Sequence, residues 1–69
     1  MTRIPVESST LASVQYYPQT MTLEIEFKNG TIYQYFDIPE TLFNELLCAE
    51  SKGKFLHQQI KGLYRYAKV

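Results

Sequence analysis

The chain has 69 residues, of which 45% are hydrophobic and 20% are charged, a composition that excludes an intrinsically disordered protein and allows one small globular domain. The formal net charge is zero, but residues 1–50 hold two basic residues and all seven acids, whereas residues 51–69 hold five basic residues and no acid. Such an asymmetry indicates an electrostatic partner for the basic end of the chain.

Several simple features narrow the class of protein further. The single cysteine, Cys48, excludes an intramolecular disulfide. Residues 1–5 lack the apolar segment of a signal peptide, and no run approaches the roughly 18 apolar residues that a membrane-spanning helix needs. We therefore expect a cytoplasmic protein that is not associated with a membrane.

The first regular element is expected after a polar lead-in, residues 3–10, in which only a brief pairing at Val6 is predicted. Residues 11–17 alternate in side-chain character, which predicts a strand that ends at Pro18. A connection of hairpin length follows, so this strand is expected to lie antiparallel beside residues 22–27.

Residues 22–36 are predicted to form a β-hairpin around Asn29-Gly30, the strongest short-range turn signal in the chain. A two-residue turn would leave the Gln34 amide on the apolar face of the hairpin. A three-residue loop with a bulge at its glycine places Tyr33 and Tyr35 on the apolar face and Gln34 outside. We favour the bulged register, because a buried amide without a partner costs about 1–3 kcal/mol.

Two helices are predicted to follow the hairpin. Residues 39–49 carry apolar side chains at helical spacing, and Pro39 suits the first helical position. A second helix is predicted between Ser51, which can cap its start, and Gly62, which is placed to end it. Residues 63–69 alternate again and form either a fourth strand on a sheet edge or an ordered tail.

These elements predict an α+β fold, an antiparallel three- to four-stranded meander covered by two short helices. The apolar faces of the helices need a partner, and the apolar face of the meander is the surface available to them. We expect a single domain over residues 1–69, with residues 1–5 loosely ordered.

A set of short motifs runs in order through nearly the whole chain, over about residues 6–69. They are Ser8-Ser9 before a strand, Leu-x-Ile-x-Phe-x-x-Gly at 23–30, Tyr33-x-Tyr35, Ile38-Pro39, Ala49-x-Ser51-x-Gly53, Ile60 and Tyr64. Together they resemble the KTSC domain, a small domain found at the C-terminus of some lysyl-tRNA synthetases and as a stand-alone bacterial protein. The resemblance implies no catalytic residues, and the occurrence of the domain in lysyl-tRNA synthetases suggests RNA as a partner.

The strongest candidate binding surface lies in residues 51–69, where cations are interleaved with aromatic rings. Cations contact a phosphate backbone and rings stack on unpaired bases, as in proteins that bind single strands. The predicted nucleic-acid-binding residues are Lys52, Lys54, Lys61, Tyr64, Arg65, Tyr66 and Lys68. The alternative is that these cations face the acidic sheet surface of Glu24 and Glu26 and have no external partner.

Two interpretations of the family motif residues Tyr33 and Tyr35 stay open. They are stacking platforms for bases if they face outward, as sheet aromatics are in several single-strand binders. They are core rings if they face the helices, with hydroxyls that find polar partners at the sheet margin. The bulged register of the hairpin favours the core interpretation.

Catalytic chemistry has little support in the sequence. His57 is the only histidine and Cys48 the only cysteine, so a metal site would have to recruit carboxylates. A nucleophile pair of these two residues would require that they meet in one pocket. We instead interpret Cys48 as a small buried hydrophobe on the first helix and His57 as a polar surface residue on the second. We expect no enzyme, no metal and no cofactor.

The sequence therefore favours a non-catalytic module that binds RNA through its basic and aromatic C-terminal surface. The alternative is a protein-interaction module without a nucleic-acid role. It would add a strand at an exposed sheet edge or dock the outer patch of Ile32 and Phe36, either on another protein or on a second copy. The sequence leaves the oligomeric state open.

Overall fold

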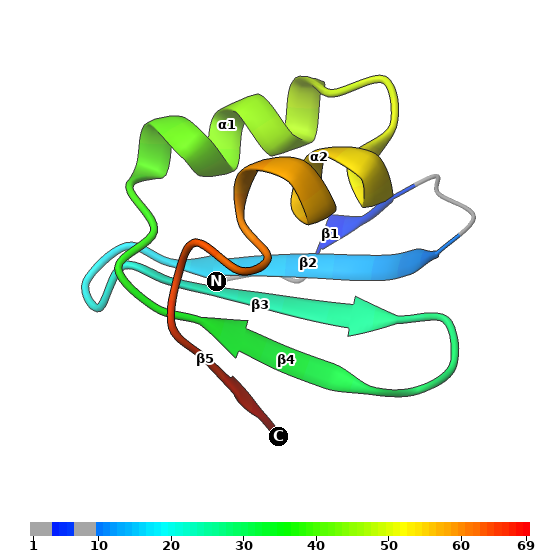
Figure 1. Cartoon of the computed structure of the whole chain (residues 1–69), viewed down its shortest axis with the longest axis horizontal. Helices are drawn as coiled ribbons and strands as arrows, with labels where there is room; N and C mark the ends of the chain where they lie inside the picture. The colour runs from blue at the N-terminus through cyan, green and yellow to red at the C-terminus, as the bar shows by residue number, and fades with distance from the viewer. Residues whose placement is uncertain (1–3, 7–9) are drawn as a thin grey trace.

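The computed structural model describes residues 4–6 and 10–69, and its centre is a five-stranded antiparallel sheet whose strands follow chain order (Figure 1). The strands are β1 (Ile4–Pro5), β2 (Leu11–Tyr17), β3 (Thr22–Phe27), β4 (Ile32–Tyr35) and β5 (Tyr66–Lys68). Two helices, α1 (Glu40–Cys48) and α2 (Lys52–Gln59), connect β4 to β5. The α+β class and the central meander are confirmed, and the short strands β1 and β5 extend the meander on either side.

The N-terminal predictions concern residues that the structure describes only in part. Residues 1–3, and Ser8 and Ser9 of the family motifs, lie outside the described residues. Ile4–Pro5 pairs with β2, and the Val6 N–H donates to the Ala12 carbonyl at 3.3 Å. The brief pairing predicted at Val6 is therefore present.

The β3–β4 turn has the bulged form. The Phe27 N–H donates to the Thr31 carbonyl at 2.8 Å, and the Gly30 N–H donates back to the Phe27 carbonyl at 2.9 Å. Gly30 has a φ of +91°, a conformation that costs glycine little and other residues more. The positive φ of Gly30 allows the bulged turn, and this turn fixes the register of the hairpin.

This register decides which face of the sheet the motif tyrosines occupy. Tyr33 lies opposite Ile25 and Tyr35 lies opposite Leu23, so both tyrosines share the face of the core residues. Tyr35 is 1% exposed, whereas Tyr33 is half-buried. The core interpretation of the two tyrosines is confirmed in orientation, although Tyr33 keeps contact with solvent.

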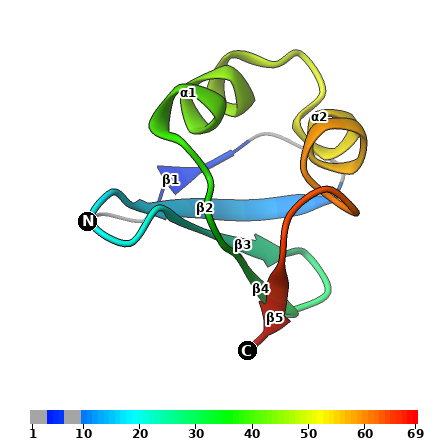
Figure 2. The same cartoon turned by 60° about the vertical axis from the view of Figure 1, so that its left-hand side comes forward.

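The two helices cover the apolar face of the sheet, as both cartoon views show (Figures 1 and 2). Helix α1 starts one residue later than predicted, with Pro39 extended at the N-cap, and buries Phe43 and Leu46. The Ser51 hydroxyl accepts from the Lys54 N–H at 3.4 Å and caps α2, as predicted. The core that results consists of Leu11, Val14, Tyr16, Leu23, Ile25, Tyr35, Ile38, Phe43, Leu46, Leu56 and Ile60.

Tyr16 ties α1 to the sheet. Its ring is stacked on that of Phe43 with centroids 4.9 Å apart, and its hydroxyl donates to the Ile38 carbonyl at 2.5 Å. Both partners are buried, so the hydroxyl satisfies a carbonyl that would otherwise be orphaned just before the helix. The start of α1 is therefore fixed by a polar and an apolar contact of one side chain.

Cys48 is exposed, and its predicted burial is wrong. It is the last residue of α1 and lies two positions after the buried Leu46, which is more than half a turn around the helix. The side chain therefore points away from the sheet. His57 is exposed on α2, as predicted.

The C-terminal residues form a strand and not merely a tail. Gly62 has a φ of +85° and turns the chain from α2 back towards the sheet. The Phe36 N–H donates to the Arg65 carbonyl at 2.9 Å, and the Val69 N–H donates to the Ile32 carbonyl at 2.8 Å. These bonds bracket β5 and fix it along β4 as an edge strand.

No helix of the described residues lies on the opposite, outer face of the sheet (Figure 2). Its centre is polar and internally paired. The Gln34 amide donates to Glu24 at 2.9 Å, and the Ser13 hydroxyl donates to Glu26 at 2.8 Å. Ile32, on the same face, is half-buried.

Candidate nucleic-acid interface

The C-terminal strand β5 brings two predicted site residues beside the motif tyrosines. Tyr66 lies opposite Tyr35, and Lys68 lies opposite Tyr33. Residues two apart on a strand share a face, so Tyr66 and Lys68 both lie on the helix-covered side. In Figure 2, β5 is at the margin of the sheet farthest from α1.

Three tyrosines, Tyr33, Tyr35 and Tyr66, form what we call the tyrosine cluster. The ring of Tyr66 lies 5.7 Å from that of Tyr33 and 5.8 Å from that of Tyr35, and the rings of Tyr33 and Tyr35 are 6.3 Å apart. Phe27 extends the cluster with an edge contact to Tyr33 at 5.5 Å. Tyr66 is 59% exposed and therefore forms the outer layer of the cluster.

Burial raises the pKa of the Tyr35 hydroxyl above its ordinary value, and the neighbouring Tyr33 and Tyr66 raise this pKa further. The hydroxyl is protonated at neutral pH and acts there as a hydrogen-bond donor. The tyrosine cluster therefore includes one neutral hydroxyl, that of Tyr35, whose ring is flanked by the rings of Tyr33 and Tyr66.

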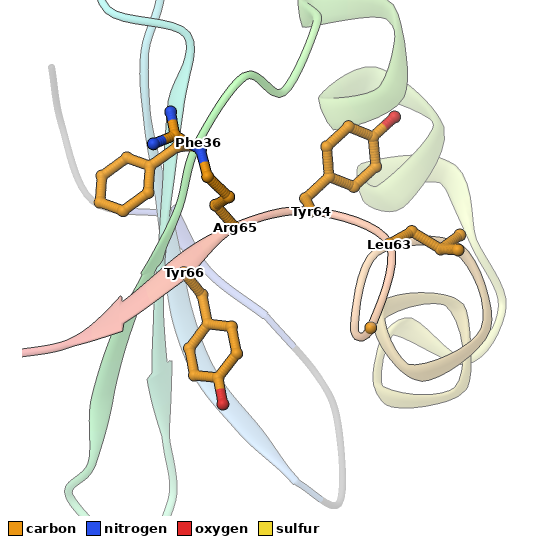
Figure 3. Close-up of a pocket in the computed structure, with 6 residues that line it drawn as sticks. Phe36, Leu63, Tyr64, Arg65 and Tyr66 are labelled. Atoms are coloured by element: carbon orange, nitrogen blue, oxygen red, sulfur yellow. The ribbon is translucent and has the colours of Figure 1, made fainter.

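A shallow hollow, which we call the terminal hollow, lies where the segment after α2 joins β5 (Figure 3). Its walls are Phe36, Gly62, Leu63, Tyr64, Arg65 and Tyr66. Arg65 and Phe36 lie together on one side of β5, with the guanidinium 5.8 Å from the ring centroid, and Tyr66 points to the other side (Figure 3). Three residues of the predicted site thus line one depression of the surface.

A second depression, which we call the α2 pocket, lies between the sheet and α2 and has a volume of about 200 Å³. The sheet side of the pocket consists of Thr10, Phe27, Tyr33 and Tyr35. The helix side consists of Gly53, Leu56, His57 and Lys61. The pocket therefore joins Lys61 of the predicted site to both motif tyrosines, whose rings contact Tyr66 of the terminal hollow.

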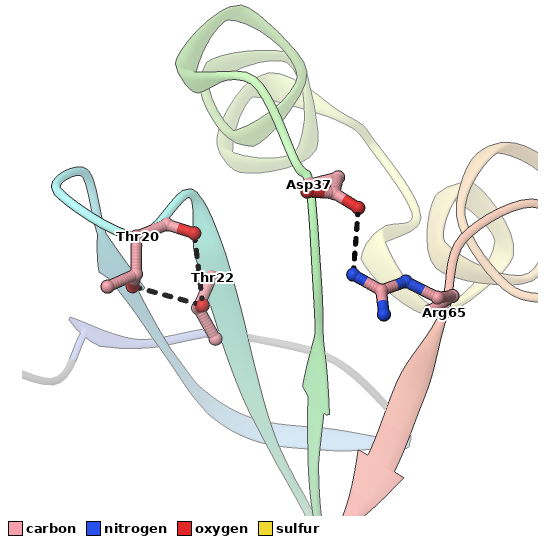
Figure 4. Close-up of polar contacts among 4 residues, drawn as sticks. All are labelled: Thr20, Thr22, Asp37 and Arg65. Carbon is pink, nitrogen blue, oxygen red and sulfur yellow. Dashed lines mark hydrogen bonds and ion pairs between the residues drawn. The ribbon is translucent and has the colours of Figure 1, made fainter.

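Arg65 is the one predicted cation with an acidic partner among the described residues. Its guanidinium lies 3.2 Å from the Asp37 carboxylate, and the two side chains are 79% and 71% exposed (Figure 4). An ion pair so open to water adds at most about 1 kcal/mol to the stability of the fold.

Figure 4 also shows the connection between β2 and β3, where the Thr20 hydroxyl donates to the Thr22 hydroxyl at 3.0 Å.

Lys52 and Lys54 lie apart from the tyrosine cluster. They occupy the first turn of α2, whereas Lys61 follows its last turn. The Lys52 ammonium donates to the Ala49 carbonyl at 3.1 Å, and Lys54 lines a separate hollow beside the α1–α2 connection. The structure therefore gathers Lys61, Tyr64, Arg65, Tyr66 and Lys68 around the end of the chain and leaves the two remaining lysines at the far end of the helix.

His57 was not among the predicted site residues, because the sheet residues that line the same pocket are distant from it in sequence. In the structure it lines the α2 pocket with Lys61, four residues later, and with Tyr33 and Tyr35. The spacing of four between His57 and Lys61 is the sequence signal that both side chains lie on one side of the chain. The identity of that side becomes clear only once α2 is placed on the sheet.

The catalytic arrangements considered from the sequence receive no support from the described residues. Cys48 and the acids are absent from the α2 pocket that holds His57. No group of three or more His, Cys, Asp or Glu residues within the described ranges is placed to hold a metal ion. No helix in these ranges is long and apolar enough to cross a membrane.

A model of the KTSC domain family matches residues 7–69. A lysine–tRNA ligase of Nostoc sp. (strain PCC 7120) is 43% identical over 63 residues, which are 91% of this chain and 11% of that enzyme. An uncharacterized protein of Stutzerimonas stutzeri is 37% identical over 70 residues, which cover 100% of this chain and 99% of that protein. The chain thus spans a small part of the ligase it matches and the full length of a small protein.

A solved structure shows the same fold. It is the crystal structure of a KTSC domain protein from Yersinia pestis, which matches with a TM-score of 0.94 at 38% sequence identity. The match covers 99% of this chain and 96% of the other.

Proposed function

The chain belongs to the KTSC domain family, and from this premise we propose that it is a non-catalytic module that binds single-stranded RNA. The observation that carries the proposal is the position of Tyr66. Its ring is 59% exposed, yet two other tyrosine rings hold it within 6 Å. A large ring that is exposed and already fixed can stack a base with little further loss of side-chain entropy.

The cations around Tyr66 supply the charge that a nucleic acid requires. Lys68 lies on the same face of β5, and Lys61 lies in the adjoining α2 pocket. Tyr64 and Arg65 line the terminal hollow on the other side of Tyr66. We propose that these residues make the direct contacts. Lys52 and Lys54, at the other end of an α2 about 12 Å long, add longer-range attraction to phosphates.

The relatives favour RNA over other polyanions. Three similar proteins, two from Nostoc and one from Trichormus variabilis, are named lysine–tRNA ligases. The region similar to this chain is 11% of each of them, so their ligase activity is not carried over. A small module joined to an enzyme that acts on tRNA is well placed to bind RNA. We propose that this chain also binds RNA, and that it does so in the cytoplasm.

The test is fluorescence anisotropy with a labelled single-stranded RNA of about ten nucleotides at about 50 mM salt. Lys68→Ala is expected to weaken binding about five- to tenfold at this salt concentration, the effect of one lost phosphate contact. Lys28→Ala is the matched control, because Lys28 is an exposed lysine on the β3–β4 turn, away from Tyr66. Absence of binding at low salt, or equal losses in the two variants, contradicts the proposal.

A second candidate function, strand addition by a protein partner, is favoured by the edge position of β5. The pairs Phe36–Arg65 and Ile32–Val69 bond across to β4, so by alternation the backbone groups of Tyr66 point away from the sheet, together with those of Lys68. An unpaired row of this kind is a template for another strand.

Sedimentation equilibrium separates this candidate from RNA binding. Self-association that is insensitive to salt and is lost in Lys68→Pro would favour strand addition, because proline removes an outward N–H without breaking a bond to β4. A monomer at all concentrations would remove strand addition between two copies of this chain.

A further inference from the structure

The α2 pocket has polar side chains on both of its sides. Tyr33 and Tyr35 lie on the sheet side, and His57 and Lys61 lie on the helix side. Its volume of about 200 Å³ is roughly seven times the 30 Å³ that a water molecule occupies in the liquid. The pocket therefore has room for a group of several heavy atoms, such as an oxyanion and part of its ester.

The polar side chains of the pocket form a donor set. The Lys61 ammonium is only a donor, and the His57 ring and the hydroxyls of Tyr33 and Tyr35 can each donate. No Asp or Glu lies among the residues that line the pocket. The Tyr35 hydroxyl is protonated at neutral pH like any tyrosine, and its raised pKa extends this state to higher pH. Such a set suits a ligand that consists of acceptors and carries negative charge.

The Tyr35 hydroxyl lacks a partner within the described part of the chain. The side chain is 1% exposed, and the hydrogen bonds of the described residues do not include its hydroxyl. Every fully buried side-chain oxygen or nitrogen in the same ranges has a partner. The Tyr35 oxygen therefore keeps some exposure to solvent, and the α2 pocket is the depression that Tyr35 lines. A buried donor left open towards a pocket gains from a ligand that accepts its hydrogen bond.

The backbone of Lys61, which lines this pocket, is fixed at the end of α2. Its N–H donates to the Leu56 carbonyl at 2.7 Å, in the turn that closes α2, and Leu56 is itself 3% exposed in the core. The position of the lysine backbone is thus tied to the buried side of the helix. The backbone of Lys61 is therefore already ordered, and only its side chain has to be ordered when the ammonium binds an anion.

We propose that the α2 pocket binds a phosphate group, which accepts hydrogen bonds from Lys61, His57, Tyr33 and Tyr35. This inference rests on the proposed function where the phosphate belongs to RNA, either as a terminal phosphate or as an internal phosphodiester. A free phosphate offers the same acceptors. The pocket would then fix one point of the strand, and Tyr66, whose ring contacts those of Tyr33 and Tyr35, would stack the adjoining base.

The first measurement is a titration of the intact protein with inorganic phosphate at constant ionic strength, followed by amide shifts and the His57 ring signals. We expect shifts confined to the pocket. Lys61→Ala is expected to weaken phosphate binding at least about tenfold, the usual effect of a lost bond between charged groups, and Tyr35→Phe about threefold. Lys54→Ala is the matched control, because Lys54 lies on the same helix outside the pocket. Equal responses of the Lys61 and Lys54 variants would overturn the proposal.

The second measurement identifies the source of the phosphate. Two RNA oligonucleotides of one sequence are compared, one with a 5′-phosphate and one with a 5′-hydroxyl. Tighter binding of the phosphorylated strand that disappears in Lys61→Ala assigns the pocket to a terminal phosphate. Equal binding of both strands, weakened together in Lys61→Ala, assigns it to the backbone.

The two proposals fail in different ways. Inorganic phosphate in the pocket without binding of either strand would support the pocket and remove the RNA function. Strands that bind through Tyr66 but are indifferent to Lys61→Ala and Tyr35→Phe would support the function and overturn the pocket.

Discussion

Tyr66 and Tyr35 face each other across the β4–β5 ladder with ring centroids 5.8 Å apart, yet Tyr66 is 59% exposed and Tyr35 is 1% exposed. One tyrosine belongs to the core and the other covers it from outside. If Tyr66 stacks a base as proposed, the pair separates a role in stability from a role in binding, and substitutions at the two positions are expected to act on different measurements.

Tyr66→Ala is expected to weaken RNA binding with little loss of stability. Removal of one stacking ring costs about 1–3 kcal/mol of binding, or roughly five- to 150-fold in affinity. The free energy of unfolding should fall by about 1 kcal/mol, since the ring loses contacts with two neighbours but leaves no enclosed cavity. Anisotropy and urea denaturation measure the two effects.

Tyr35→Ala is expected to show the opposite balance. Truncation of a buried aromatic ring costs about 3–5 kcal/mol, a large part of the roughly 3–10 kcal/mol available to a domain of this size. The variant should unfold at much lower urea concentration or fail to fold. A stable Tyr35→Ala variant, or a Tyr66→Ala variant as unstable as it, would show that the exposures of the two rings do not set their roles.

The salt dependence of RNA binding should report which cations touch phosphates. Each contact to a single strand contributes a slope of about −0.7 in log K against log salt concentration. Contacts from Lys61, Arg65 and Lys68 give about −2.1, and contacts from all five C-terminal cations give about −3.5. Lys61→Ala/Lys68→Ala should remove about 1.4 from the slope, and Lys52→Ala/Lys54→Ala should change the slope much less. Equal effects of the two double variants would indicate a diffuse attraction by the whole basic segment.

The sheet and its register were predictable from local sequence, because the determining signals are short in range. The alternation over residues 22–27, Asn29-Gly30 and the cost of burying Gln34 together select one hairpin. The helix start at Pro39 and the cap at Ser51 are equally local, and both lie within one residue of the prediction. Local steric and hydrogen-bonding rules were sufficient at these positions.

The distribution of the C-terminal residues was not predictable in the same way. The sequence places five cations within nineteen residues, but α2 separates Lys52 and Lys54 from Lys61, and alternation along β5 sends Arg65 to the face opposite Tyr66. The α2 pocket joins residues of β4 to residues in and just after α2 that are at least 18 positions away. Such contacts depend on how the helix docks on the sheet, which local patterns do not specify.

Gly30 should be the most sensitive position of the β3–β4 turn. Its φ of +91° is unfavourable for other L-residues, and a Cβ placed there would meet no atom within 4 Å. Gly30→Ala is therefore expected to cost about 1–2 kcal/mol through backbone strain alone. Gly30→Asn should cost less than half as much, because asparagine tolerates positive φ. Urea denaturation of the two variants checks this order, and equal losses would point to a lost contact in place of strain.

The hydrogen bond from Tyr16 to the Ile38 carbonyl should make stability depend on pH in the alkaline range. Burial raises the pKa of Tyr16 above its ordinary value of 10.0, and the nearby Glu40 raises this pKa further. A raised folded-state pKa means that the stabilisation is complete below the unfolded-state value and is lost as the pH rises through the folded-state value. The free energy of unfolding should thus fall above about pH 10.

Tyr16→Phe isolates this contribution. At pH 8 the variant should be about 1 kcal/mol less stable, because it leaves the buried Ile38 carbonyl without a partner. The difference between the two proteins should shrink above about pH 10, since only the wild type loses stability through this hydroxyl. Tyr35, whose pKa is also raised, titrates in both proteins and cancels in the comparison. Tyr17→Phe, on the outer face of the same strand, is the control and should match the wild type at pH 8. A difference between wild type and Tyr16→Phe that stays constant up to pH 11 would show that the Tyr16 hydroxyl does not govern the alkaline loss of stability.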